Sequence, residues 1–289
     1  MKLVQKVILV LALLISITGA LLYDAFYAAP SRFSVRHETL SSIYIPEQLD
    51  NINILFFTDL DYGTFMDESR LNKLVDTINS LSPDVVIFGG DLFDKDATVT
   101  DDMVHTVSEA FHSITAPLGK FAVFGDFDYA DDNRNTQVQT VLWNADFEIL
   151  ENKSVLIRNT GSQSIALVGI DNGVNGTQDI DAAYASVSRT AYVLTVCHTP
   201  DSADDVPSDI TKYFLAGHSL GGQVYYGFGA MYTPPMAEEY LRGKHTVKNS
   251  FTIDISSGVG TTGEDVRFLS NAEVVLYRLQ HKTVTDSTN

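Results

Sequence analysis

Residues 84–91 read DVVIFGGD, a short apolar run that ends in two glycines and an aspartate. A short run of this kind, rich in β-branched residues, is typical of a strand that is buried on both faces. Four more apolar runs end in an ionisable side chain, at 53–61 (NILFFTDLD), 121–126 (FAVFGD), 192–198 (YVLTVCH) and 213–218 (YFLAGH). The repeated pattern predicts five buried strands that each end in a residue able to bind a metal ion.

Amphipathic segments separate the first of these strands. Helical spacing of apolar residues predicts a helix over 71–81, which Pro83 ends, and further helices at 101–114 and near 137–143. After residue 147 the sequence becomes richer in strands, and further ones are predicted at 147–150, 155–157, 165–170, 223–226, 250–255 and 273–279. Alternation at the front predicts a parallel core sheet, and the strand-rich second half predicts a second sheet. The expected fold is a layered α/β sandwich.

Composition limits the class of protein. With 289 residues, 45% of them hydrophobic, the chain is long enough for one sizeable core but short for two independent domains. Its 19 basic and 37 acidic residues give a formal charge of −18, which repels phosphate backbones, so nucleic acid is not an expected partner. Cys197 is the only cysteine, which excludes an intrachain disulfide.

The N-terminus predicts a membrane helix. Lys2 and Lys6 precede an apolar run from 7 to 23, which has about the length needed to cross a bilayer. The basic flank should stay in the cytoplasm, which places everything after Asp24 outside. We therefore expect a single-pass protein of the cell membrane with an extracytoplasmic domain.

A cleavable signal peptide is the alternative for this run. Candidate cleavage sites near Ala20 and Ala28 are poor, because Phe26 and Tyr27 interrupt the small-residue pattern, so an uncleaved anchor is favoured. The chain then divides into an anchor at 1–24, a spacer and first strand region at 25–50, a domain at 51–280 and a polar tail at 281–289.

The polar residues at the strand ends predict a metal site. Ligands bind at the carboxyl edge of open α/β sheets, and carboxylates gathered there repel one another unless they bind protons or cations. Asp59 and Asp61 are two residues apart, so in an extended segment both side chains lean to one side. Carboxylates with imidazoles suit one or two divalent ions such as Mn²⁺, Fe²⁺, Zn²⁺ or Mg²⁺. The predicted ligands are Asp59, Asp61, Asp91, Asp126, His198 and His218.

These stretches resemble the motifs of the calcineurin-like metallophosphoesterase superfamily, above all a branch of bacterial membrane-attached members. The resemblance covers about residues 51 to 280 and is carried by 82–94 (SPDVVIFGGDLFD), 119–129 (GKFAVFGDFDY), 196–201 (VCHTPD), 216–224 (AGHSLGGQV) and 256–268 (SSGVGTTGEDVRF). It implies a four-layer α/β/β/α sandwich, here preceded by one transmembrane helix. It also implies two metal ions bridged by an aspartate and a hydroxide, and hydrolysis of phosphate esters.

The chain departs from the family pattern at three positions. Asp61 and Leu220 stand where the family usually has histidines, and Asp126 stands where it has an asparagine. The resemblance therefore implies one metal site with four ligands, Asp91, Asp126, His198 and His218. It implies a second, thinner site with Asp59, the shared Asp91 and Asp61.

Phe127 occupies the position of the family's histidine that assists the leaving group. Loss of a general acid costs about 10²- to 10⁴-fold in rate. Substrates with good leaving groups, such as pyrophosphates or activated esters, should suffer least.

Two hypotheses of function follow. The favoured one is an extracytoplasmic metal-dependent phosphoesterase that hydrolyses a phosphodiester or pyrophosphate, either a small phosphate ester or an envelope or lipid-linked molecule. The alternative is a degenerate pseudo-phosphoesterase that binds a metal ion or a protein partner in the cell envelope.

A serine esterase is a third and weaker hypothesis. Residues 217–221 (GHSLG) match the nucleophile motif G-x-S-x-G with Ser219, and Asp254 or Asp265 with His281 would complete the order of a triad. That motif requires a strand, a turn and a helix, whereas the sequence after Ser219 is rich in Gly, Tyr and Pro.

Overall fold

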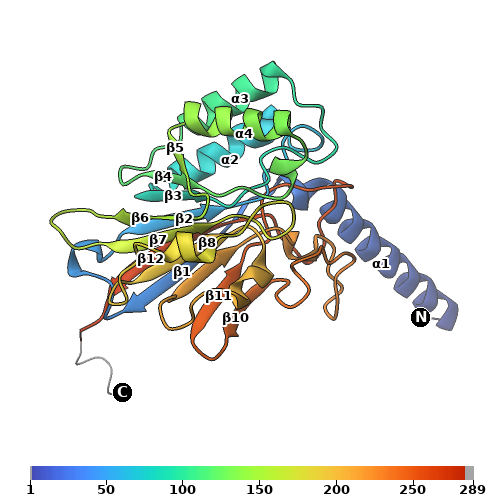
Figure 1. The fold of residues 1–289 in the computed structure, drawn as a ribbon. Helices are drawn as coiled ribbons and strands as arrows, with labels where there is room; N and C mark the ends of the chain where they lie inside the picture. The colour runs from blue at the N-terminus through green and yellow to red at the C-terminus, as the bar shows by residue number, and fades with distance from the viewer. Residues whose placement is uncertain (1, 284–289) are drawn as a thin grey trace.

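Two six-stranded sheets stack face to face in the computed structural model, which describes residues 2–283 (Figure 1). From residue 284 on, the predicted polar tail lies outside the described residues. The first sheet has the order β1-β12-β2-β3-β4-β5, with β1 Ser34–Ser42, β12 Glu273–His281, β2 Asn53–Phe57, β3 Val85–Phe88, β4 Lys120–Ala122 and β5 Phe147–Ile149. The second has the order β10-β11-β9-β8-β7-β6, with β10 Gly243–Val247, β11 Phe251–Ile255, β9 Tyr213–Ala216, β8 Val193–Cys197, β7 Ile165–Ile170 and β6 Lys153–Ile157.

The centre of each sheet is parallel. In the first sheet β2, β3, β4 and β5 run in parallel, as the alternation of strands and helices predicts. In the second sheet β7, β8, β9 and β11 are parallel, with β6 and β10 antiparallel at the edges. Parallel strands bring their carboxyl ends to one edge, so the loops that follow them gather there.

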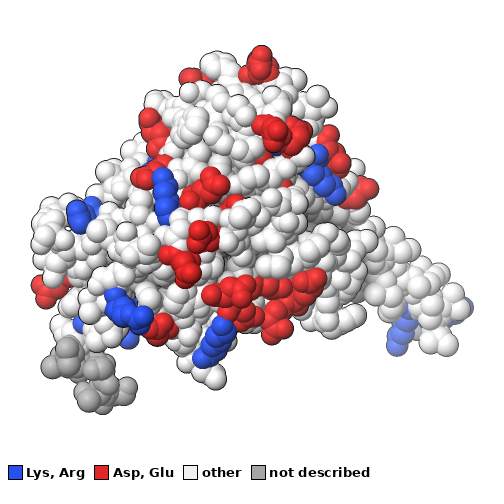
Figure 2. Space-filling view, in the orientation of Figure 1, with Lys and Arg blue, Asp and Glu red and all other residues white. Residues whose placement is uncertain are grey.

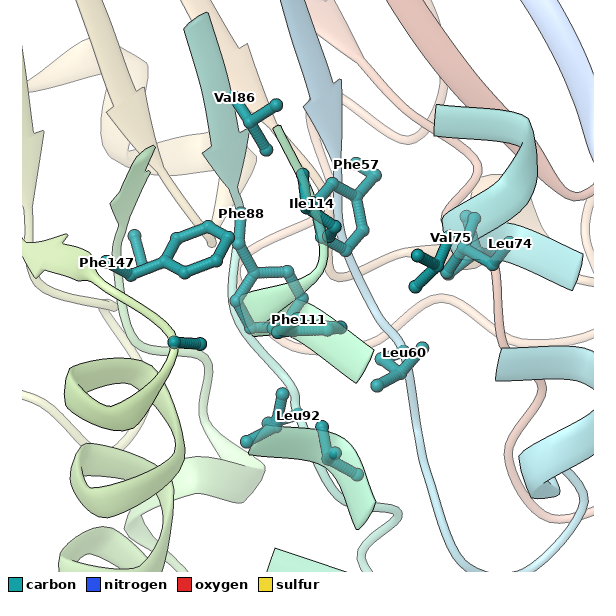
Figure 3. Packing of buried hydrophobic residues seen from close by; sticks show 14 of the residues in the cluster. Phe57, Leu60, Leu74, Val75, Val86, Phe88, Leu92, Phe111, Ile114 and Phe147 are labelled. Atoms are coloured by element: carbon teal, nitrogen blue, oxygen red, sulfur yellow. The ribbon is translucent and has the colours of Figure 1, made fainter. Parts of the chain in front are cut away.

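Helices α2 (Glu68–Ser80), α3 (Asp101–His112) and α4 (Asp132–Asn144) cover the outer face of the first sheet (Figure 1). Each begins at a side-chain cap, in which Asp67, Thr100 or Asp131 accepts a hydrogen bond from a backbone N–H of the first turn. Beneath them Phe57, Phe88, Phe111 and Phe147 pack with ring centroids 5.1 to 5.6 Å apart (Figure 3).

A second apolar core fills the space between the sheets, and a third lies on the outer face of the second sheet beside α5 (Ile180–Tyr184) and the 3-10 helix η5 (Pro200–Asp204). The order of layers is therefore helix, sheet, sheet, helix. The four-layer α/β/β/α sandwich that the family resemblance implies is confirmed.

The predicted strand at 223–226 is wrong. A short 3-10 helix, η6 (Leu220–Gly222), precedes this segment, and only isolated bridges form, Val224 with Phe268 and Tyr225 with Ala230. Leu220 and Gln223 have φ of 51° and 50°, and this left-handed backbone interrupts a continuous ladder. The sequence did not indicate three short helices around β1: η1 Asp24–Ala28 and η2 Ala29–Ser31 precede it, and η3 Glu47–Leu49 follows it.

Helix α1 (Leu3–Tyr23) projects away from the domain and buries none of its side chains (Figure 1). It is long and apolar enough to cross a membrane. Its visible surface is uncharged except near the N-terminal end, whereas acidic side chains are spread over the domain (Figure 2). The segment after α1 is seated in the domain, because Ala25 and Pro30 are buried and the Ala25 carbonyl accepts a hydrogen bond of 3.0 Å from the Arg267 N–H.

Candidate metal centre

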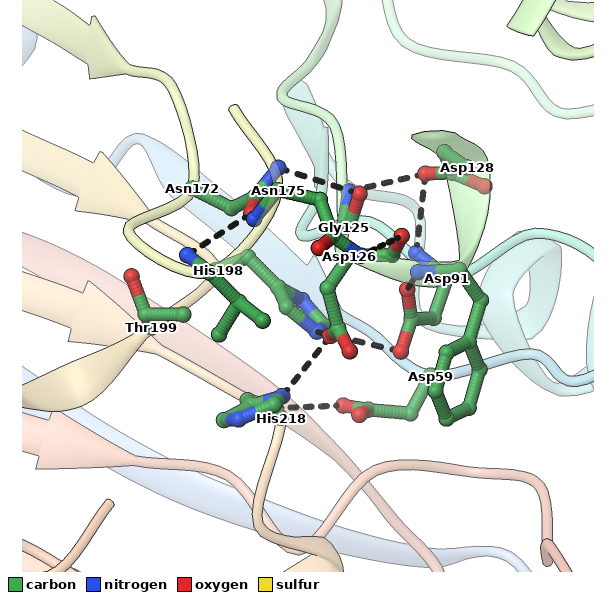
Figure 4. A network of polar contacts seen from close by, with 12 residues as sticks. Asp59, Asp91, Gly125, Asp126, Asp128, Asn172, Asn175, His198, Thr199 and His218 are labelled. Carbon is green, nitrogen blue, oxygen red and sulfur yellow. Dashed lines mark hydrogen bonds and ion pairs between the residues drawn. The ribbon is translucent and has the colours of Figure 1, made fainter. Parts of the chain in front are cut away.

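Four buried ligand-type side chains converge where the carboxyl ends of the two sheets meet (Figure 4). Asp91 and Asp126 follow β3 and β4 of the first sheet, and His198 and His218 follow β8 and β9 of the second. One ligand atom from each lies within 4.8 Å of all the others. Strands from different sheets therefore contribute to one cluster, as the strand-end pattern predicts.

The Asp126 carboxylate lies at the centre of this cluster. Its Oδ1 atom is 2.9 Å from His218 Nδ1 and 3.3 Å from His198 Nε2. The same His198 Nε2 atom lies 3.1 Å from Asp91 Oδ2. These contacts link both carboxylates to the imidazoles.

Backbone carbonyls orient both imidazoles. His198 Nδ1 lies 2.7 Å from the Gly89 carbonyl oxygen, and His218 Nε2 lies 2.7 Å from the Pro235 carbonyl oxygen. A carbonyl only accepts, so each of these ring nitrogens carries the proton. The opposite nitrogen of each ring then faces the cluster, which is the usual arrangement of a metal-binding histidine.

Two buried atoms of the cluster have close neighbours but no hydrogen bond. His198 Nε2 and Asp126 Oδ1 are 3.3 Å apart, yet neither makes a hydrogen bond of acceptable geometry. Buried polar atoms are nearly always satisfied, so each exception calls for a missing partner. A cation between the four side chains would satisfy both atoms, and two carboxylates with two imidazoles suit a divalent metal ion.

The charges of the cluster are strongly coupled. Burial raises the pKa of Asp91 to about 7, against the opposing effect of His198. Burial lowers the pKa of His198, but the charge of Asp91 and the contact with Asp126 outweigh it, so that pKa lies well above its ordinary value. Burial likewise raises the pKa of Asp126, and the contacts with both imidazoles more than reverse this. The cluster requires added positive charge, which either protons or a cation can supply.

Several site residues have left-handed backbone. The φ angles of Asp59, Asp61, Asp91 and His218 are 55°, 52°, 58° and 69°. Non-glycine residues adopt this region rarely, and such strain clusters at functional sites. The conformation turns the chain sharply after the strands, and Asp91 and His218 of these four residues belong to the cluster.

The predicted extended segment at Asp59 and Asp61 is therefore wrong, and both residues stand outside the four-ligand cluster. Asp59 Oδ2 accepts a hydrogen bond of 3.2 Å from the His218 N–H. Asp61 Oδ1 is buried without a hydrogen bond. Burial, and then the charges of Asp91 and Asp59, raise the pKa of Asp61 well above its ordinary value.

Arg267 provides a cation beside these two aspartates. Its buried guanidinium donates hydrogen bonds to the carbonyls of Ser257, Gly258, Gly260 and Ser270. Burial lowers the pKa of Arg267 to about 10, against the attraction of Asp59 and Asp61. The Arg267 charge also opposes, without reversing, the increase in the pKa of Asp61 that burial causes. A guanidinium of the chain itself thus offsets part of the negative charge on this side.

A cleft of about 1020 Å³ opens from the cluster. Asp59, Asp61, Asp91, Asp126 and His218 line its inner end. Phe127 and Leu220 line it as well, so the apolar replacements predicted from the sequence face the same cavity as the acidic residues.

The model of the calcineurin-like phosphoesterase family matches residues 52–224, more than half of the chain. The chain belongs to the calcineurin-like phosphoesterase family. The chain is 26% identical over 258 residues to the metallophosphoesterase YkuE of Bacillus subtilis, a match that covers 89% of this chain and 88% of YkuE. It is 24% identical over 251 residues to a transmembrane protein with metallophosphoesterase domain from Bos taurus, covering 82% of this chain and 54% of the bovine protein. A solved structure, the calcineurin-like phosphoesterase YfkN from Bacillus subtilis, aligns with a TM-score of 0.43 at 12% identity over 72% of this chain and 81% of that chain.

Two asparagines and an aspartate support the four-ligand cluster without belonging to the predicted ligands. Asn172 and Asn175 donate to the Gly125 and Asp126 carbonyls over 3.2 and 3.1 Å. Asp128 accepts hydrogen bonds from the backbone N–H groups of Asp91, Leu92 and Gly125 over 3.0, 2.9 and 2.8 Å. Asn172 could have been found from the sequence, because it follows β7 by two residues and is thus a sixth polar strand end.

Glycine is required beside Asp91. A Cβ atom at Gly125 would lie 2.0 Å from Asp91 Oδ1, so only glycine lets the two loops approach. The close approach allows the Phe127 N–H to donate to Asp91 Oδ1 over 2.9 Å. Asp91 is thus held by the backbone of the neighbouring loop.

The residues of the serine-esterase hypothesis do not meet. Ser219 Oγ donates to the Leu241 carbonyl over 2.6 Å, and only the three-residue η6 follows it. Asp254 accepts from Arg36, Tyr213 and Tyr277, and the His281 Nδ1 atom lies 2.6 Å from the Ile45 carbonyl oxygen. Asp265 pairs with Arg70. Within residues 2–283 no triad forms around Ser219.

We expect Asp128→Ala to lower the free energy of unfolding by about 3 kcal/mol, because three buried N–H groups lose their acceptor. Asp131→Ala is the matched control, since the Asp131 cap accepts from one N–H only, and its loss should cost about 1 kcal/mol. Urea unfolding of both variants measures the difference. Equal losses would contradict the role assigned to Asp128.

Proposed function

We propose that this calcineurin-like phosphoesterase is a membrane-anchored enzyme with an extracytoplasmic domain, which hydrolyses phosphodiester or pyrophosphate bonds with one divalent metal ion. The convergence of Asp91, Asp126, His198 and His218 carries the proposal. These four residues would hold the ion. A divalent ion bound there supplies Lewis-acid polarisation of the phosphate and a water molecule whose pKa is brought towards neutrality.

The reaction consumes water and needs no other reactant. The oxygen of water forms a bond to phosphorus, and the bond between phosphorus and the leaving oxygen breaks. The leaving oxygen keeps the electron pair, the hydroxyl of water stays on phosphorus, and the remaining proton goes to solvent or to the leaving oxygen.

The leaving group sets the requirement on the substrate. Phe127 lines the cleft beside Asp126 and cannot transfer a proton. A leaving group that departs as a stable anion, such as a phosphate or an aryl oxide, needs no proton from the protein. Pyrophosphates and activated diesters are therefore the preferred substrates.

Two features support the membrane location and the side of the membrane. Helix α1 has the length and apolarity of a membrane span, and Lys2 and Lys6 lie at its N-terminal end. Basic residues flanking a span stay in the cytoplasm, so the domain after Asp24 lies outside.

A second candidate function is a phosphoesterase fold that binds a metal ion or a protein partner in the cell envelope without turnover. Phe127 and Leu220 favour it, since both replace groups that the family uses. The first candidate predicts turnover that is lost when Asp91 is replaced, and the second predicts no such turnover.

The full chain in detergent should hydrolyse an aryl phosphodiester in the presence of Mn²⁺ and should retain about one metal ion per chain, since a four-ligand site is expected to be occupied. Asp91→Asn should lower kcat/KM by at least about 10²-fold, because it removes a proposed ligand. Asp146→Asn is the matched control, because Asp146 is exposed and has a similar φ of 60°. Metal retention without any turnover that depends on Asp91 would reject the enzyme in favour of the second candidate.

The role of Phe127 is tested by the dependence of rate on the leaving group. The protein should show a steep decrease of log kcat/KM with rising leaving-group pKa, since it offers no proton donor there. Phe127→His should raise the rate for the most basic leaving groups by roughly 10²-fold and flatten the slope. Phe127→Leu should leave the slope steep. An unchanged slope in Phe127→His would show that protonation at this position does not limit the reaction.

A further inference from the structure

The cleft that opens from the metal cluster is walled by the membrane helix. Its lining includes Thr18, Leu21 and Leu22 of α1 and then Ala25 and Phe26 of η1. The C-terminal turns of α1 and the ligands Asp91 and Asp126 thus border one continuous cavity. A substrate that fills this cavity touches both the metal cluster and the end of the membrane span.

The facing wall is apolar as well. It is formed by the segment after η6 and by the loop that contains Arg267, with Val224, Met231, Tyr232, Pro234, Val266 and Phe268. Met231 is 70% exposed and Tyr232 is 63% exposed, and Phe228 of the same segment is 90% exposed. Large apolar side chains exposed together mark a surface that contacts a membrane, a ligand or another protein.

Because this wall lies at the end of a membrane helix, the bilayer is the contact that its position favours. The apolar run 7–23 is about 25 Å long at 1.5 Å per residue, close to the roughly 30 Å thickness of the hydrocarbon core. The cleft residues 18–26 therefore lie where the hydrocarbon meets the headgroups. Tyr23 and Tyr27, whose rings stack with centroids 5.5 Å apart, are side chains typical of that depth.

Only an amphiphile matches both ends of the cleft. Its inner end is acidic and suits a metal-bound phosphate, whereas its outer walls offer hydrocarbon and aromatic side chains. A small water-soluble phosphate ester would leave these walls wet. A lipid chain that moves from the bilayer into the cleft exchanges one apolar environment for another, so its placement there costs little.

We propose that the substrate is a lipid phosphoester of the bilayer, whose phosphate reaches the metal cluster while its hydrocarbon chain lies between the end of α1 and the segment 224–235. The proposal rests on the proposed phosphoesterase activity for its chemistry and on the cleft for the lipid chain. The hydrolysed bond is the one described above, with water as the only co-reactant.

A pair of substrates that share one aryl leaving group tests the lipid chain. The full chain is reconstituted in phosphatidylcholine vesicles with Mn²⁺ and given an aryl ethyl phosphate or an aryl hexadecyl phosphate. We expect kcat/KM to be at least about 10²-fold higher for the hexadecyl ester, because its chain holds it in the bilayer beside the cleft and covers the apolar wall, which the ethyl ester leaves wet.

Variants separate the effect of contact with the wall from simple partitioning of the long-chain ester into the vesicles, because partitioning is the same for every variant. Met231→Asp should lower the hexadecyl-to-ethyl ratio at least about 10-fold, because a charge on the wall opposes the chain. Leu156→Asp is the matched control, since Leu156 is 50% exposed on β6 and does not line the cleft. A ratio that falls equally in both variants, or in neither, would overturn the proposal.

Photocrosslinking provides a readout without turnover. Protein loaded with Mn²⁺ in the same vesicles is irradiated with a hexadecyl phosphate that carries a diazirine in its chain, and the labelled residues are mapped. We expect labels in both 18–26 and 224–235. Labels confined to the exposed face of α1, with none in 224–235, would overturn the lipid assignment.

The two readouts distinguish the two proposals. Labels on both walls without hydrolysis of either ester would retain the lipid site and reject the phosphoesterase activity. Equal hydrolysis of both esters with no labels on the walls would retain the activity and reject the lipid substrate.

Discussion

The buried negative charge of Asp91 and Asp126 is the constraint around which the rest of the site is arranged. Both carboxylates are buried at the line where the two sheets meet, at the inner end of the cleft. Their repulsion is offset by two imidazoles from the opposite sheet, and each imidazole is turned towards them by a backbone carbonyl. Loops from both sheets therefore adopt unfavourable left-handed backbone conformations. Asp128 accepts hydrogen bonds from three backbone N–H groups of this region. A cation bound at the centre would explain why so much strain and buried charge are kept in one place.

Charge compensation differs between the two sides of the cluster, and this makes the site asymmetric. On one side four side chains converge, and two of their buried atoms have no hydrogen bond, whereas on the other side Asp61 Oδ1 is the buried atom without one. On the other side the guanidinium of Arg267 offsets Asp59 and Asp61, and the wall continues with apolar residues such as Leu220. The proposed single metal ion, the lack of a proton donor at Phe127 and the apolar exit towards α1 all fit the proposed substrate, which has a good leaving group and a hydrocarbon chain.

The sequence predicted the layered fold and the convergence of the strand ends, because apolar runs that end in Asp or His are local patterns and parallel strands share one edge. It failed where distant segments decide the backbone. The predicted strand at 223–226 is broken by the left-handed backbone at Leu220 and Gln223, which the contacts of the 256–268 loop favour. The roles of Asp128 and Arg267 depend on which backbone groups surround them, and no spacing in the sequence encodes that. The cleft between α1 and 224–235 joins elements some two hundred residues apart, so only the folded chain reveals it.

Anomalous diffraction from crystals of the protein grown with Mn²⁺ tests the central claim most directly, since it counts the ions and locates each one. The arrangement of the ligands predicts a single strong peak within coordination distance of Asp91, Asp126, His198 and His218, with no peak between Asp59 and Asp61. Two peaks of equal strength that share Asp91 would contradict the one-metal site, and the absence of any peak at the four ligands would contradict the metal centre itself.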